Sequence, residues 1–303
     1  MSAAIDFKEH VLSMTPSVFA LLKFTVTPLL VGIISLIARR YGASVAGLLI
    51  GFPIMTAPIA FFIALEQGPA FAARACIGVL FALAGCAAFC MAFVTIASWA
   101  RGAQRRRRRV LIAALVGAII SFCGVNALLV AAQDAVGLDL VGAAGVASGM
   151  LVLAAITIPK PTTIPDASMP WWDIVVRMLA TAAMVGAITA LAARLGPILA
   201  GIVATYPVML TVIGSFSFAR NGHATLASFY RGSMLSMLSF ALFFIIVGGL
   251  IEAWGTSLTF ALATIAALAF SPCVRAIDGL FGGAGATQWS KTARKPFKLR
   301  ERS

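Results

Sequence analysis

The chain has 303 residues, of which 61% are hydrophobic and only 11% are charged. Soluble domains have close to half apolar and about a quarter charged residues, so this composition excludes an ordinary soluble enzyme or binding domain. The formal charge of +13 does not indicate nucleic-acid binding, because Lys and Arg collect between long apolar stretches, as in the cytoplasmic loops of membrane proteins. We therefore expect an all-α integral membrane protein, with residues 1–303 as one membrane domain.

Apolar runs of about 20 residues predict transmembrane helices in nine places along the chain. They cover residues 17–38, 43–65, 71–99, 110–132, 139–158, 172–192, 197–219, 225–251 and 256–272. No cleavable signal peptide is expected before the first span. The last residues, 273–303, are Gly-rich and then basic, and predict a cytoplasmic tail.

The distribution of Lys and Arg predicts the orientation in the membrane. Seventeen of them fall on one side of the predicted spans, and only Lys8 and Arg194 fall on the other. Basic loops stay in the cytoplasm, so we expect a periplasmic N-terminus and a cytoplasmic C-terminus in a bacterial inner membrane. The run from Arg105 to Arg109 would meet anionic lipid headgroups at the inner surface.

An internal repeat is the most informative feature of the sequence. Residues 31–68 match residues 185–222 without a gap, and 13 of the 38 aligned positions are identical. Glycine and proline are among the identities, which two unrelated apolar helices do not share in register. We therefore expect two four-helix repeats, 17–132 and 172–272, joined by a linker helix at 139–158. Four spans followed by one linker span place the start of the second repeat on the opposite side of the membrane from the start of the first. The two repeats are therefore expected to be inverted.

The segment 46–78 combines a Gly-rich helix start, a proline break and a charged-Gly turn. In the first copy the features are Gly47, Gly51, Pro53, Glu66 and Gly68, and in the second Gly201, Thr205, Pro207, Arg220 and Gly222. This pattern resembles the core of the GlpM-like family of small four-helix bacterial inner-membrane proteins. The resemblance implies a fused, doubled version of such a unit. It implies no activity, because that family has no settled one.

Two prolines predict a binding site near the bilayer midplane. Pro53 and Pro207 occupy matching positions, and each frees a helical carbonyl where lipid cannot replace the hydrogen bond. A plain kink is the alternative explanation. Paired midplane irregularities in inverted halves favour a solute site. The hydroxyl-bearing residues nearby are Thr56, Thr205, Tyr206 and Thr211.

Four basic residues lie within the predicted spans at related positions of the two repeats. Lys23 aligns with Arg177, and Arg74 lies three positions from the equivalent of Arg231. They could attract an anionic group, or their side chains could extend to lipid headgroups. The sequence favours neither reading.

No catalytic arrangement, metal site or cofactor is predicted, because carboxylates avoid the middle of the spans and the two histidines lie on opposite sides. The first hypothesis is a secondary transporter or facilitator of a small solute, anionic or amphipathic. The second is a non-catalytic membrane subunit that anchors or assembles cell-envelope machinery. A lipid-active enzyme would be a third class, but it lacks the residues for catalysis. Self-association into a homo-oligomer is compatible with each.

Overall fold

The structure, a computed structural model, describes residues 25, 29, 32, 33, 36, 53, 56–100, 107–159 and 172–281. This part of the chain is helical, with a single 3-10 turn, η1 (Ser98–Ala100). The helices are α4 (Thr56–Gln67), α5 (Pro69–Ala97), α6 (Arg107–Val136), α7 (Leu140–Thr157), α8 (Trp172–Ala204), α9 (Val208–Asn221), α10 (His223–Trp254) and α11 (Thr256–Phe281). Most of the predicted spans 17–38 and 43–65 lies outside the described residues, as do Lys23 and the basic residues from 282 onward.

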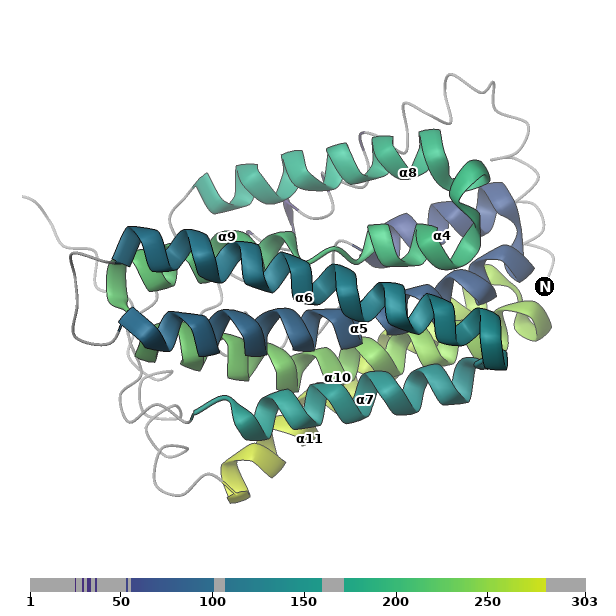
Figure 1. Cartoon of the computed structure of the whole chain (residues 1–303). Helices are drawn as coiled ribbons and strands as arrows, with labels where there is room; N and C mark the ends of the chain where they lie inside the picture. Colours follow the sequence, from purple (N-terminus) through teal and green to yellow (C-terminus); the bar gives the residue numbers. More distant parts are fainter. Residues whose placement is uncertain are drawn as a thin grey trace, which may run out of the picture.

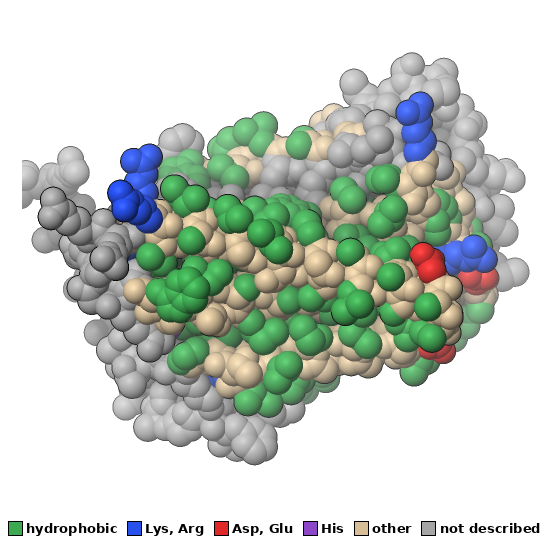
Figure 2. Space-filling model, in the orientation of Figure 1, with side chains coloured by type: hydrophobic (Ala, Val, Ile, Leu, Met, Phe, Trp, Pro, Cys, Tyr) green, Lys and Arg blue, Asp and Glu red, His purple; other side chains and the backbone are tan. Residues whose placement is uncertain are grey.

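Five of the described helices, α5, α6, α7, α10 and α11, are long and apolar enough to cross a membrane. They pack side by side as a bundle, with α5 at its centre (Figure 1). Apolar side chains cover the flank of the bundle, and charged side chains gather at its two ends (Figure 2). This is the surface of a helical protein that spans a membrane several times.

Helix α5 forms the core because it is apolar on every face. It contacts α4, α6, α7, α8 and α10, and side chains such as Leu80 and Phe81 are completely buried. The surrounding helices turn stripes of small residues toward it. Buried alanines recur four positions apart at Ala114 and Ala118 in α6, and at Ala143 and Ala147 in α7. Such spacing keeps one narrow face of each helix in close contact.

The two ends of the bundle differ in their exposed acidic side chains. The turns between α5 and α6 and between α9 and α10 lie at one end, together with Arg107, Arg108 and Arg109; we call it the basic end (Figure 1). The turns between α4 and α5, α6 and α7, and α10 and α11 lie at the other end (Figure 1). Glu66, Asp139 and Glu252 are exposed there, and we call it the acidic end.

The predicted single helix over 197–219 is wrong. Gly196, at φ 75°, reverses the chain after the first part of α8, and a short helix of residues 197–204 comes next; we call it the half-helix 197–204. It stops at Thr205, and α9 begins only after Pro207. Proline has no N–H to continue the ladder, and the residue before a proline avoids the α conformation. Together these two effects interrupt the helix where a kink was predicted.

The end of the last helix also differs from the prediction. Helix α11 continues through Pro272 to Phe281, past the predicted end of the final span at residue 272. The first residues of the predicted tail, 273–303, are therefore helical. One face of α11 still follows the expected periodicity, with Ala263 and Ala267 fully or almost fully buried.

The half-helix 197–204 and α5 touch through their backbones. A Cβ atom added to Gly78 would collide with the carbonyl of Ile198, and one added to Gly201 would collide with the carbonyl of Ala75. Only glycine permits this approach from both sides. The crossing fixes the half-helix against the most buried helix of the bundle.

Gly78→Ala and Gly201→Ala should each lower the stability of the folded protein by roughly 1–3 kcal/mol, since the helices must move apart. Gly124→Ala in α6 is the matched control, because nothing lies within 4 Å of its added Cβ atom. Thermal unfolding of the purified variants in detergent measures the difference. Equal unfolding temperatures for Gly78→Ala and Gly124→Ala would contradict the close crossing.

Candidate functional site

The interruption between the half-helix 197–204 and α9 is the centre of the candidate site. A helix end leaves its last carbonyls without partners, and burial makes that costly. Here two tight turns use two of them: the N–H of Thr205 donates to Ile202, and the N–H of Tyr206 donates to Val203, each at 3.2 Å. The carbonyl of Val203, four residues before Pro207, is therefore satisfied locally.

Side chains cap the remaining carbonyls of the half-helix. The Thr205 hydroxyl donates to Gly201 at 2.9 Å, and the Thr56 hydroxyl donates to Ala204 at 3.3 Å. The thiol of Cys86 lies 3.9 Å from the carbonyl oxygen of Thr205 and donates weakly to it. The acceptors at this helix end are thus used by the protein itself.

The bond from Thr56 to Ala204 brings the two predicted proline sites together. Thr56 lies in the first turn of α4, three residues after the buried Pro53. Helix α4 runs beside the half-helix in the opposite direction (Figure 1), and Ile59 and Ile63 pack against Ala200 and Ala204. The starts of α4 and α9 therefore lie near the same level of the bundle.

The two prolines begin their helices in the same way. The carbonyl of Pro53 accepts from the N–H of Ala57 at 2.7 Å, and that of Pro207 accepts from Thr211 at 2.9 Å. A helix start also leaves N–H groups unpaired, and a proline at this position has no side-chain oxygen to offer them. The first turns of α4 and α9 contain no acidic residue. The start of α9, whose N-cap Pro207 makes no side-chain cap, is consequently positive and rich in donors.

The other predicted hydroxyl residues lie around the same point. Thr211 turns its hydroxyl back to the carbonyl of Pro207 at 2.9 Å. Tyr206 is half-buried, and its ring lies edge-on to that of Phe122 in α6, with the centroids 5.5 Å apart. Sequence reasoning missed the contact of Cys86 with Thr205. The small pair Gly85 and Cys86 was the available signal that α5 approaches a neighbour closely there.

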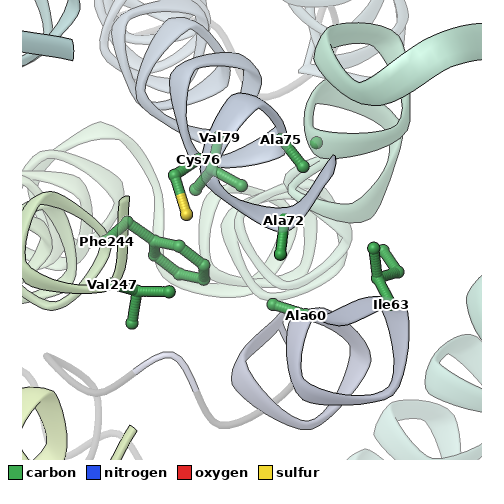
Figure 3. Close-up of a pocket in the computed structure, with 9 residues that line it drawn as sticks. Ala60, Ile63, Ala72, Ala75, Cys76, Val79, Phe244 and Val247 are labelled. Carbon is green, nitrogen blue, oxygen red and sulfur yellow. The ribbon is translucent and has the colours of Figure 1, made fainter. Parts of the chain in front are cut away.

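A small cavity lies beside the contact of α4 with the half-helix (Figure 3). Its volume is about 10 Å³, roughly the room of one water molecule. It is lined only by apolar or small residues from α4, α5, α8 and α10: Ala60, Ile63, Ala72, Ala75, Cys76, Val79, Gly201, Phe244 and Val247. The predicted hydroxyl residues do not line it.

The predicted basic residues do not gather at the interruption. Arg74 is exposed near the start of α5, at the acidic end. Arg231 is half-buried near the start of α10, toward the basic end, and its guanidinium donates to the carbonyl of Ala155. Ala155 lies in the last turn of α7, where a cation satisfies unpaired carbonyls. The side chain of Arg177 in α8 lies outside the described part.

Searches of protein-family models, curated proteins and solved structures found no match to this chain. The resemblance to the GlpM-like family therefore stays a prediction, and support for a function comes from the geometry alone.

Arg231→Met should lower the stability by about 1 kcal/mol, because the last turn of α7 loses a charged donor. Arg74→Met is the control: it removes the same charge from an exposed site and should leave the unfolding temperature nearly unchanged. Thermal unfolding in detergent compares the two. A larger loss for Arg74→Met would mean that its charge has a structural partner and would contradict this assignment.

Proposed function

We propose that the chain is a secondary transporter or facilitator of a small anionic or amphipathic solute, working by alternating access. In this proposal nine spans cross a bacterial inner membrane, with the N-terminus outside, the C-terminus inside and two inverted repeats joined by α7. The carrying observation is the interruption between the half-helix 197–204 and α9 in the interior, where the carbonyls of the half-helix are capped and the N-cap Pro207 of α9 makes no side-chain cap.

Matched backbone geometry supports the repeat. Gly68 and Gly222 are 154 positions apart and precede α5 and α10, with φ 88° and ψ 166° in one and φ 89° and ψ −168° in the other. The carbonyls of Pro53 and Pro207 also accept matching backbone hydrogen bonds, from Ala57 and Thr211, and these pairs are 154 positions apart as well. Glycine is favoured at such positive φ because other side chains are strained there.

The directions of the matched helices support the inversion. In Figure 1, α5 runs from the acidic end to the basic end, and α10 runs the opposite way beside it. Helices α4 and α9 likewise leave the middle of the bundle toward opposite ends. In inverted-repeat transporters the solute binds at the repeat interface, where interrupted helices meet near the bilayer midplane.

The chemistry of the interruption favours an anionic group. The positive start of α9 lies close to the first turn of α4, and neighbouring carbonyls already have donors. A carboxylate or phosphate would accept from the free N–H groups, and the helix dipoles would stabilise its charge. A cation would find these carbonyls occupied.

Thermal unfolding with a ligand panel tests this proposal. Acetate, butanoate and hexanoate are compared with their primary amides, which have similar shape and no charge. A carboxylate that binds only the folded protein should stabilise it by about 2.7 kcal/mol at 100 times its Kd, while the amides should not. Equal shifts from both series would contradict anion recognition. A stoichiometric partner on purification, without any ligand shift, would favour the membrane-subunit hypothesis.

A pair of variants at Pro207 tests the location. Pro207→Asp places a carboxylate next to the first N–H groups of α9, where it should compete with an external anion. Pro207→Asn offers the same shape without the charge. The carboxylate shift should be lost in Pro207→Asp and largely kept in Pro207→Asn. Loss of the shift in both to the same extent would mean that the charge of the helix start is not what binds.

A further inference from the structure

The two halves of the bundle differ at the place that holds the cavity. The lining residues of the cavity have counterparts 154 positions away, and the described counterparts also lie together in space. Cys76 corresponds to Tyr230, Ala60 to Gly214, and Val247 to Phe93. The added Cβ atom of Gly214 would collide with Tyr230, and the rings of Phe93 and Tyr230 are 5.6 Å apart. The matched residues of the second half therefore surround an equivalent position, and the Tyr230 side chain occupies it.

Tyr230 fills that pocket completely. It is 0% exposed, and its hydroxyl donates to the carbonyl of Leu210 at 3.0 Å, in the first turn of α9. Its ring meets Phe89 and Phe93 of α5 edge-on and Phe229 at a tilt. Phe218 of α9 adds a further edge-on contact to Phe93, with 6.4 Å between centroids. Together they form an aromatic layer: Phe89, Phe93, Phe218, Phe229 and Tyr230.

The aromatic layer lies between the interruption and the basic end. Along α5 from the basic end come Phe93, then Cys90, then Cys86, whose thiol contacts Thr205 at the interruption. Arg107 at the basic end lies over the ring of Phe218, 5.6 Å from its centroid. The ring of Tyr230 contacts Phe89 and Phe93, which flank Cys90 along α5, so this ring helps to exclude water from Cys90.

We infer that Tyr230 is the gate that closes the basic-end half of the solute pathway in this conformation. The inference rests on the proposed function, since a gate needs a pathway. The cavity at Cys76, the counterpart of Tyr230, is lined by small residues, so the half of the solute pathway toward the acidic end is less tightly packed. Opening toward the basic end requires Tyr230 to release Leu210 and leave Gly214, so α9 and α10 must separate.

The buried thiols report on this gate without any knowledge of the solute. The test uses the full chain with the exposed Cys123 and Cys273 changed to Ser, in detergent, treated with methyl methanethiosulfonate. Chymotryptic cleavage after Phe81 and Phe89 separates Cys76, Cys86 and Cys90 for mass spectrometry. Tyr230→Ala should raise the modification rate of Cys90 about tenfold or more, because removing the ring leaves a void and lowers the cost of local opening. The rate at Cys76 should not change.

Two comparisons make the result specific. Phe243→Ala removes a fully buried ring from the same helix, outside the aromatic layer, and should leave Cys90 at its original rate. Tyr230→Phe keeps the ring, loses only the hydroxyl and should raise the rate much less than Tyr230→Ala. If Tyr230→Ala does not fold, Tyr230→Leu replaces it, with a smaller rise expected.

An unchanged rate at Cys90 in folded Tyr230→Ala or Tyr230→Leu overturns the gate, and so does an equal rise in Phe243→Ala. A selective rise at Cys90 in a protein that binds no carboxylate would support the gate while contradicting the anionic solute. The experiments therefore distinguish a failure of the Tyr230 gate from a failure of the anionic-solute proposal.

Discussion

An interrupted helix in an apolar interior must find partners for its broken hydrogen bonds, and the rest of this structure depends on how that is done. The half-helix 197–204 ends on its own tight turns and on donors from two other helices, Thr56 of α4 and Cys86 of α5. The Cys86 donor lies on α5, which approaches the half-helix closely because Gly78 and Gly201 let the two backbones touch. Stability and the candidate site therefore share the same contacts.

The capping is one-sided, which gives the site its chemical character. Carbonyl groups at the end of the half-helix have protein donors, whereas the helix starts after Pro53 and Pro207 receive no side-chain oxygen from these prolines. A soluble helix start would be capped by Ser, Asp or water. In a membrane interior an unpaired N–H group is costly, so in the proposed transporter a solute that accepts from the first N–H groups of α9 would gain affinity. Such a site would bind an anion without a buried arginine.

Much of the fold could be predicted from the sequence, because apolar length and Gly/Pro register are local signals. The limits of α5, α7 and α10 lie within three residues of the predicted spans. The full interruption at Pro207 was underestimated, although Tyr206 before a proline signals it. The roles of Cys86 and Tyr230 could not be predicted, because each depends on which helix faces which. Similarly, Arg74 and Arg231, three positions apart in the repeat alignment, lie toward opposite ends of the bundle, as inverted repeats would place them.

In the proposed inverted arrangement the two halves enter the membrane from opposite sides, so the matched turns should lie on opposite sides of it. Gln67 and Asn221 are 154 positions apart, and each ends the helix before a matched glycine. Gln67→Cys and Asn221→Cys, each made without Cys123 and Cys273, are treated in intact cells with a membrane-impermeant maleimide. Inverted halves predict labelling at residue 67, and labelling at residue 221 only after the membrane is permeabilised. Labelling of both from the outside would place the matched turns on one side and contradict the inverted arrangement.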